Sequence, residues 1–125
     1  MALPPRLDKE LGELRQGVEV EITEEADAIS IVIRAFSVGE GFNQPTTNVL
    51  LRVPRTYPDA GPDMFWTSPE LLLANGNVPQ AAESMENYLG KLWRRFSWHK
   101  AAWNPRIDNL HGYLEFIRRR LREKK

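Results

Sequence analysis

The sequence predicts an α+β fold, with one helix at the start of the chain, four strands after it and helices at the end. Three patterns indicate this: an apolar stripe at helical spacing before residue 15, short alternating segments up to residue 67, and a second stripe after residue 106. Of the 125 residues, 42% are hydrophobic and 27% charged, a balance typical of globular proteins. This length suffices for a hydrophobic core, so we expect a single domain over residues 1–125.

The first element is predicted to be a short helix that begins at Pro4-Pro5 and ends before Gly17. Proline suits the first turn of a helix, because the amide hydrogen that it lacks has no partner there, and glycine commonly follows the last turn. One side carries leucines and the other sides carry charged residues. The stripe consists of Leu7, Leu11 and Leu14, and the charged residues are Asp8, Glu10, Glu13 and Arg15.

Four strands are expected next, joined by short connections into an antiparallel meander. Three isoleucines of the second strand alternate and should point the same way, and Phe36 falls out of that register. A glycine-rich loop separates the second and third strands, and Pro54 ends the third because proline cannot donate to a ladder. The four strands are predicted at residues 18–22, 28–36, 47–53 and 63–67.

The C-terminal part of the chain is predicted to form helices that pack on the sheet. Residues 80–97 place apolar side chains at mostly helical intervals, although Gly90 weakens this helix. Residues 107–121 form a regular stripe at three- and four-residue steps, typical of an amphipathic helix. The apolar positions are Met85, Leu89, Leu92, Trp93 and Phe96 in the first helix, and Ile107, Leu110, Leu114, Ile117 and Leu121 in the second.

Charge and cysteine content exclude several classes of function. Basic and acidic residues both number 17, so the net charge of zero gives no argument for nucleic acid, although the last eight residues contain six basic side chains. That basic end fits either an acidic or phosphate-bearing partner or the solvated end of a helix. The sequence has no cysteine, which excludes disulfides, thiolate metal sites and thiol catalysis. Without a signal-peptide core or a membrane-length apolar run, we expect a cytoplasmic protein that binds no membrane.

Several motifs occur in an order that resembles the ubiquitin-conjugating (UBC-like) family. A Pro-x-x-Tyr-Pro turn at residues 54–58 precedes a strand with Phe65 and Thr67, then a Trp-x-Pro at residues 103–105 and a closing helix. The chain looks closest to a bacterial branch, the prokaryotic ubiquitin-conjugating-like family E. The resemblance implies a UBC-like fold: an N-terminal helix, a four-stranded antiparallel meander and C-terminal helices. It also implies a ubiquitin-like modifier, an adenylating activating enzyme and a JAB-type peptidase as pathway partners.

The chain departs from that family where the chemistry would lie. The family's His-Pro-Asn is matched here by Ser68-Pro69-Glu70, which puts a carboxylate where an amide would steady negative charge. The usual nucleophile is a cysteine, and this chain has none. Counting forward through residues 75–79 places Pro79 at that position, whereas counting back from Trp103 leads to Arg95, Phe96 and Ser97. Both alignments stay open.

Two serines are candidate replacements for the missing cysteine. Ser97 with His99 is the first, because a histidine can remove the proton that makes a hydroxyl a poor nucleophile. The alternative is a helix end with a capping hydroxyl and a surface imidazole. Ser68 with Glu70 is the second, and its alternative is an ordinary helix cap. We therefore predict Ser97 and His99 as the catalytic pair, if the protein is an enzyme.

Candidate binding residues surround the same segment. Arg94 and Arg95 could recognise an acidic or C-terminal carboxylate group, or could be helix-face arginines that cover apolar surface. Trp98, between polar and basic residues, and Tyr57 are further candidates, and Trp66 and Trp103 are expected to pack under the turn at residues 57–58. His99, His111 and Asp108 match no zinc spacing, so we expect neither metal nor cofactor.

Three functional hypotheses follow from the resemblance and its gaps. The first is a transferase that carries the modifier's C-terminus as an oxyester on a serine, most plausibly Ser97. The second is a non-catalytic UBC-like module that binds the modifier or docks the activating enzyme. The third is a structural adaptor with no modifier at all, because a fold does not fix a function.

Overall fold

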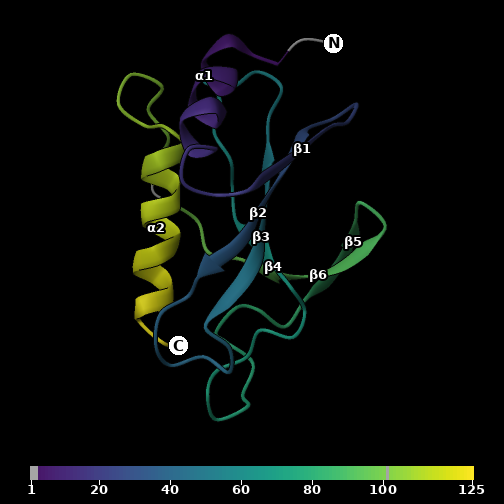
Figure 1. The fold of residues 1–125 in the computed structure, drawn as a ribbon, viewed down its shortest axis with the longest axis vertical. Helices are drawn as coiled ribbons and strands as arrows, with labels where there is room; N and C mark the ends of the chain where they lie inside the picture. The colour runs from purple at the N-terminus through teal and green to yellow at the C-terminus, as the bar shows by residue number, and fades with distance from the viewer. Residues whose placement is uncertain (1–2, 101) are drawn as a thin grey trace.

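The computed structural model describes residues 3–100 and 102–125, in which a six-stranded antiparallel sheet is joined by two α-helices (Figure 1). Residues 1, 2 and 101, which belong to the predicted domain, lie outside the described residues. The α+β class is confirmed. The elements are α1 (Pro5–Leu14), β1 (Val20–Glu24), β2 (Ile29–Ser37), β3 (Thr46–Val53), β4 (Phe65–Thr67), β5 (Met85–Tyr88), β6 (Lys91–Phe96) and α2 (Leu110–Arg122).

The first four strands form the predicted meander, in the order β1-β2-β3-β4, but the sheet then continues through β6 to β5. The prediction of four strands is therefore wrong, and six are present in the described residues. The predicted break at Phe36 is confirmed, because the β2–β3 register shifts between Ile33 and Phe36. Ala35 lies in this bulge with a φ of 54°, and an extra residue on one strand commonly requires such a conformation.

The predicted helix over residues 80–97 is wrong, because this segment forms the β5–β6 hairpin. Tyr88 pairs with Lys91 across a turn of two residues, Leu89 and Gly90, whose φ angles are 56° and 73°. Two successive positive φ angles are the mark of the tight turn that matches the twist of a hairpin. Leucine is unusual at the first of these positions, so the sequence did not indicate a hairpin turn here.

The main hydrophobic core lies between the sheet and the two helices, both of which cover the same face (Figure 1). The three isoleucines of β2 all point into it, as predicted, beside alternate residues of β3. Helix α2 begins at Leu110, where the Asn109 side chain accepts the Gly112 amide at 2.8 Å, so Ile107 lies outside the helix and is 75% exposed. The core includes Leu7 and Leu11 of α1, Ile29, Ile31, Ile33, Val49, Leu51 and Val53 of the sheet, and Leu110, Tyr113, Leu114, Ile117 and Leu121 of α2.

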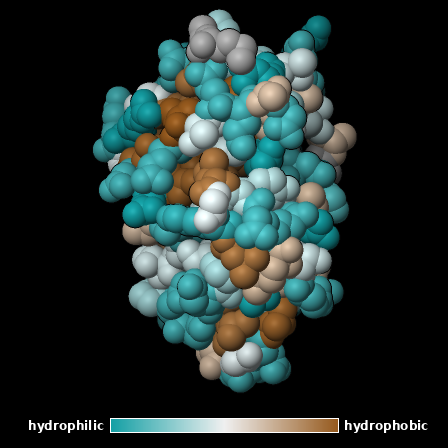
Figure 2. Space-filling view, turned by 90° about the vertical axis from the view of Figure 1, so that its right-hand side faces the viewer, coloured by the Kyte–Doolittle hydropathy of each residue, from teal (hydrophilic) through white to brown (hydrophobic). Residues whose placement is uncertain are grey.

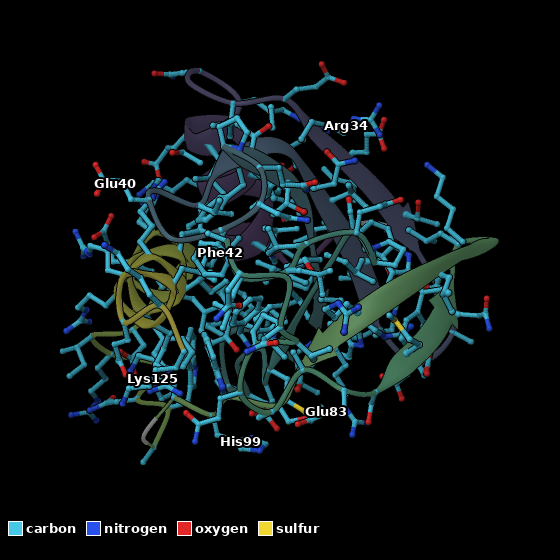
Figure 3. The ribbon with its side chains drawn as sticks, turned by 90° about the horizontal axis from the view of Figure 1, so that it is seen from below. Arg34, Glu40, Phe42, Glu83, His99 and Lys125 are labelled. Atoms are coloured by element: carbon cyan, nitrogen blue, oxygen red, sulfur yellow. The ribbon has the colours of Figure 1, made fainter. Side chains whose placement is uncertain are left out.

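A second, smaller cluster lies on the outer face of the sheet, away from the helices. Figure 3 shows α2 and the β5–β6 hairpin on opposite sides of the molecule. On the side that carries the hairpin, apolar areas are interrupted by polar ones (Figure 2). The cluster consists of Val32, Leu50, Trp66 and Trp93, with Met64, Tyr88 and Leu89 packed against it.

Glu10, which the sequence placed on a side of α1 other than the leucine stripe, joins α1 to the start of α2. The residue is 5% exposed, and its carboxylate accepts hydrogen bonds from the Tyr57 hydroxyl, the Leu110 amide at 2.9 Å and Arg6 at 2.8 Å. Arg6 also donates to the Pro105 and Asp108 carbonyls. Burial alone raises the pKa of the Glu10 carboxyl, but these hydrogen bonds outweigh it and hold the pKa below its ordinary value.

The turn at residues 57–58 packs against Trp103, as predicted. The Tyr57 and Trp103 rings are 5.7 Å apart, and the Trp103 indole donates to the Pro58 carbonyl at 2.7 Å. The Tyr57–Pro58 peptide bond is cis. A Cβ on Gly61 would overlap the Trp103 ring, so the close approach requires glycine. The same prediction is wrong for Trp66, which packs in the outer cluster instead, with its ring 5.5 Å from that of Tyr88.

Candidate functional site

The candidate site is created where strand β4 ends. Thr67 is paired with Arg94 of β6, and in the same register Ser68 would be opposite Trp93 and Pro69 opposite Leu92. Proline has no amide hydrogen to continue the ladder. In addition, the Pro69 carbonyl accepts two bonds from the Arg94 guanidinium, from Nε at 3.1 Å and from Nη2 at 3.0 Å. Strand β4 therefore ends after three residues, while its neighbours β3 and β6 continue.

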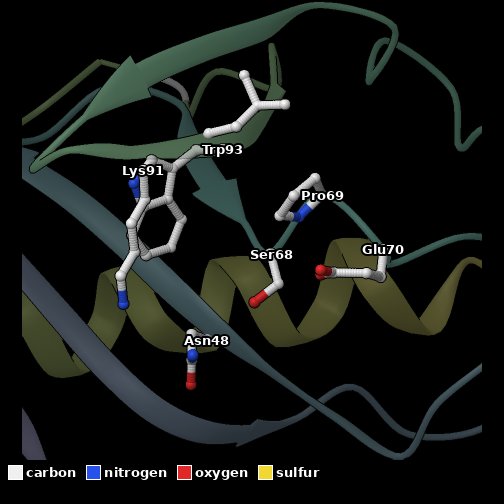
Figure 4. A pocket seen from close by; sticks show the side chains of 7 residues that line it. Asn48, Ser68, Pro69, Glu70, Lys91 and Trp93 are labelled. Atoms are coloured by element: carbon white, nitrogen blue, oxygen red, sulfur yellow. The ribbon is translucent and has the colours of Figure 1, made fainter.

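A groove opens between β3 and β6 beyond the end of β4 (Figure 4). Its volume is about 360 Å³, and it adjoins a second hollow of about 440 Å³ through the shared residues Asn48, Ser68 and Glu70. Helix α2 lies behind the sheet in Figure 4, so the groove opens on the outer face. The first hollow is lined by Asn48, Ser68, Pro69, Glu70, Lys91, Leu92 and Trp93.

The polar groups of this groove have few partners. In the described part of the chain, the Lys91 ammonium, the Glu70 carboxylate and the Ser68 hydroxyl make no side-chain hydrogen bond or ion pair. Figure 4 shows Lys91 and Asn48 on one side of Ser68 and the Glu70 carboxylate on the other. Arg34, in the adjoining hollow, lies 3.9 Å from Glu19 and 3.8 Å from Glu21. The groove thus combines unengaged polar groups with an apolar wall.

The predicted catalytic pair lies elsewhere, beyond the other end of β6. The Ser97 hydroxyl accepts a hydrogen bond from Arg95 Nε at 3.0 Å, and the His99 Nδ1 lies 2.7 Å from Asp63. Among the described residues no hydrogen bond joins Ser97 to His99. His99 lies at the rim of the molecule in Figure 3. The catalytic role of the pair stays a prediction, and this arrangement leaves the serine without an adjacent base.

Arg95 belongs to a polar network on the outer face. Its guanidinium lies 3.3 Å from the Glu86 carboxylate, which also accepts the Trp66 indole N–H at 2.8 Å. Both charged side chains are about one-third exposed (31% and 32%). Ser84 and Ser97 complete the network, with Oγ atoms 3.4 and 3.0 Å from Arg95. Arg95 is the predicted binding residue that stays reachable from solvent.

The other predicted binding residues have buried structural partners. Arg94 donates to the Ala82 carbonyl at 2.7 Å as well as to Pro69, and burial lowers the pKa of its guanidinium. Tyr57 is 2% exposed, and burial together with the hydrogen bond to Glu10 raises the pKa of its hydroxyl well above its ordinary value. Trp98 is 5% exposed and lies under the Arg120 guanidinium. Their roles in binding stay predictions.

Pro79, which one alignment places at the nucleophile position, is buried and has no reactive atom. The neighbouring residues 75–77 form a turn, in which the Asn75 side chain accepts the Asn77 amide at 2.9 Å. Ser68 is followed by a single turn, in which its carbonyl accepts the Leu71 amide at 3.2 Å, and Leu73 then bridges to Phe42. The expected helical turn after Ser68 therefore does not continue.

Sequence reasoning considered Ser68 and Glu70 but missed the residues of β3 and β6 that face them, Asn48, Lys91 and Leu92. These positions are 20 or more residues from Ser68 along the chain. The available signal was Pro69, which stands two residues after a strand and cannot extend it. Because residues 80–97 were predicted to form a helix, strand β6 was not expected, and the wall that it provides to the groove was missed.

The histidines and the basic chain end have local partners. His111 lies 3.1 Å from Glu13, and Asp108 lies 3.1 Å from Lys100. In residues 3–100 and 102–125, no group of three or more possible ligands could hold a metal ion. Arg118 lies over Phe36 and Arg120 over Trp98, so part of the basic end of α2 covers aromatic rings. No described helix is long and apolar enough to cross a membrane.

Comparison with known proteins identifies the family. The family described as Prokaryotic E2 family E matches residues 4–124, and the chain therefore belongs to this family. No curated protein and no solved structure was found to match it. The match spans both helices and all six strands, including the groove at the end of β4.

Proposed function

We propose that this member of Prokaryotic E2 family E is a non-catalytic, UBC-like binding module of a ubiquitin-like modification pathway. In this role it docks the modifier or the adenylating enzyme that activates it, and forms no covalent bond with either. Family membership supports the pathway, and the surroundings of Ser97 support the absence of catalysis at that residue.

The observation that carries this proposal is the lack of an activated nucleophile at the predicted position. The chain has no cysteine. Ser97 is engaged by Arg95, which donates to its oxygen and cannot remove its proton. His99, the predicted base, instead contacts Asp63 at 2.7 Å. A serine needs an adjacent base to attack an acyl group, and this pair does not supply one in the described geometry.

A second candidate function is an oxyester-forming transferase that uses Ser68. The observation in its favour is that the Ser68 hydroxyl lies in the groove without a partner among the described residues, next to Glu70. The hydroxyl oxygen would attack the modifier's C-terminal carbonyl on the activating enzyme. A C–O bond would form, the C–S bond of that enzyme's thioester would break, and Glu70 would take the hydroxyl proton.

A charging experiment separates these functions. The protein is mixed with an activating enzyme, its processed modifier and ATP, and intact mass and binding are both measured. The binding-module proposal predicts a complex of unchanged protein mass that survives the changes Ser97→Ala and Ser68→Ala. A hydroxylamine-sensitive adduct that is lost in one of these variants would show an oxyester at that serine. Absence of both complex and adduct would favour the adaptor hypothesis and sink the proposal.

A further inference from the structure

Another hollow lies away from the groove, between the last turns of α2 and the loop that follows β2. Its volume is about 230 Å³. Lys124, just beyond α2, lies 3.8 Å from Glu40 of this loop, and Figure 3 shows Glu40 beside the end of the helix. The hollow therefore forms where the basic end of the chain meets a loop that is far from it in the sequence. It is lined by Ser37, Val38, Gly39, Arg118 and Arg122.

The lining of this hollow contains two cationic side chains and no carboxylate. Arg118 and Arg122 are four residues apart on α2, so both project from the same side of the helix. By contrast, the two hollows at the end of β4 include Glu70, and the hollow on another side of α2 includes Glu123. The charge of the lining therefore favours an anionic ligand here.

Both arginines are available to such a ligand. Arg122 is exposed and makes no hydrogen bond or ion pair with another described residue. Arg118 pairs with Glu115, but the two side chains are 42% and 54% exposed, and exposed pairs of this kind contribute little to stability. The Arg118 guanidinium also lies over the Phe36 ring, 5.1 Å from its centre, which holds it near the sheet. An anion can therefore replace Glu115 without disturbing the helix.

The loop supplies two uncharged donors. Within the described chain, neither the Ser37 hydroxyl nor the Gly39 amide makes a hydrogen bond. The Val38 amide between them donates to the Pro45 carbonyl at 3.1 Å, which ties the loop to the start of β3. A phosphate group has three acceptor oxygens for these donors and the two guanidinium groups, whereas a carboxylate has two. The set of donors therefore suits phosphate better than a carboxylate.

The size of the hollow and the helix dipole also bear on the ligand. Sites for drug-sized molecules have volumes of roughly 300–1,000 Å³, so this smaller hollow suits one compact group. The end of a helix carries a partial negative charge of about one half, which by itself repels an anion. Arg118 and Arg122 each carry a full positive charge, so the local balance stays positive.

We propose that the hollow between α2 and the loop after β2 binds a phosphate group, either as inorganic phosphate or as the terminal group of a small phosphorylated molecule. Arg118 and Arg122 contact the phosphate oxygens, and Ser37 and Gly39 donate the uncharged hydrogen bonds. The hollow shares no lining residue with the groove at the end of β4. The inference therefore goes beyond the proposed function and does not depend on it.

The first test is a titration of the full chain with inorganic phosphate, followed by the amide resonances in NMR spectra. We expect saturable shifts at Ser37, Val38 and Gly39, with a Kd of about 1 mM or below. Sodium chloride and acetate at the same ionic strength serve as controls, because salt screens exposed charges without occupying a site. Shifts of equal size with chloride, or equal affinity for acetate, would overturn the proposal.

Variants then locate the bound phosphate. Arg122→Gln should weaken binding by about tenfold, because a charge-assisted contact is lost. Arg119→Gln is the matched control, since Arg119 is also exposed and without a partner in the described residues but lines a different hollow. Ser37→Asp should abolish binding by placing a carboxylate in the hollow, and thermal unfolding establishes that each variant is folded. Equal weakening by Arg122→Gln and Arg119→Gln would show diffuse attraction to the helix and contradict the proposal.

Two esters distinguish the sources of the phosphate group. Methyl phosphate and adenosine monophosphate are titrated under the same conditions against the wild type and Arg122→Gln. Equal affinity of phosphate and both esters would show that the phosphate group alone is recognised. Tighter binding of the nucleotide that is lost in Arg122→Gln would identify a nucleotide as the ligand. Nucleotide binding that Arg122→Gln leaves unchanged, without saturable binding of phosphate, would place the ligand elsewhere and sink the inference.

Discussion

The two faces of the sheet differ in how their polar groups are treated. On the face that carries the helices, the buried carboxylate of Glu10 accepts three hydrogen bonds, from Arg6, Tyr57 and Leu110. On the outer face, Lys91 and Glu70 line the same groove and neither side chain has a partner in the described residues. The first arrangement fixes the chain in one structure, and the second leaves charges available to another molecule.

This contrast separates residues that support the fold from residues that can serve binding. Buried charges are tolerated only when they are paired and hydrogen-bonded, so removing one partner is costly. Exposed charges without partners contribute little to stability. The comparison therefore predicts that changes of similar size have large effects on one face and small effects on the other.

The largest effect is expected for Glu10→Gln. The change removes the charge that pairs with Arg6 and one of the two acceptor oxygens, so either Arg6 or the Tyr57 and Leu110 donors lose their acceptor, and the free energy of unfolding should fall by about 3 kcal/mol. Glu13→Gln is the matched control on the exposed side of α1, where the Glu13 carboxylate contacts His111, and should cost less than about 0.5 kcal/mol. Denaturant unfolding measures both. An equal fall in the free energy of unfolding of both variants would contradict the distinction between buried and exposed carboxylates.

The same carboxylate predicts a dependence of stability on pH. The folded pKa of Glu10 lies below its unfolded value near 4.5, so its contribution is fully present above about that pH and is lost as the pH falls through the folded pKa. The wild type should lose stability toward acid faster than Glu10→Gln, and the two curves should converge. Unfolding curves between pH 7 and pH 3 test this, and parallel curves would show that another group is responsible.

Arg94→Met tests whether the Arg94 side chain helps to end β4 and to shape the groove. Arg94 holds the Pro69 and Ala82 carbonyls, and a methionine of similar length leaves both without this donor. We expect a loss of about 2 kcal/mol, together with altered chemical shifts along the groove. Arg119→Met, at an exposed position of α2, should change the free energy of unfolding by less than about 0.5 kcal/mol. A stable Arg94→Met variant with an unaltered groove would show that Pro69 alone ends β4.

Gly61→Ala should destabilise the helix-side face by about 1–3 kcal/mol, because the new methyl group overlaps the Trp103 ring. Gly12→Ala serves as the counterpart, since nothing lies within 4 Å of a Cβ there and alanine favours a helix. Its free energy of unfolding should rise by up to about 1 kcal/mol. Thermal unfolding of both variants measures these effects. A similar fall in melting temperature in both would contradict the close packing of Trp103 on Gly61.

The smallest effect on stability is expected for Lys91→Gln combined with Glu70→Gln. Neither side chain is engaged among the described residues, so the free energy of unfolding should stay within about 0.5 kcal/mol of the wild type. A marked loss of stability would mean that these charges support the fold, and the contrast between the faces would fail at this position.

Periodicity in the sequence correctly predicted those elements whose pattern depends only on residues close to one another along the chain. The isoleucines of β2 and the apolar stripe of α2 repeat at the spacing of their own structure and reach the core as expected. Residues 80–97 misled the same reasoning, because Leu89 stands where a hairpin turn usually has asparagine or glycine. Local spacing alone could not distinguish a helix from two short strands there.

The groove and the position of Glu10 could not be predicted from local pattern. Tyr57 and Leu110, which hold Glu10, are 47 and 100 residues from it along the chain. The walls of the groove come from β3, β6 and the end of β4, and their alignment depends on the strand order of the whole sheet. Pro69 was visible in the sequence, but its effect required knowing which strands lie beside it.

The early end of β4 also bears on solubility. Free strand edges at the margins of a sheet can pair with further copies and build aggregates, and here β1 carries Glu21 and Glu24 while β5 has only four residues. The early end of β4 lies within the sheet instead, between β3 and β6. Beyond it the Ser68 amide bonds the Asn48 carbonyl of β3, and the Pro69 carbonyl accepts the Arg94 guanidinium of β6. The short strand therefore adds no free edge at the margin of the sheet, where a further copy could pair.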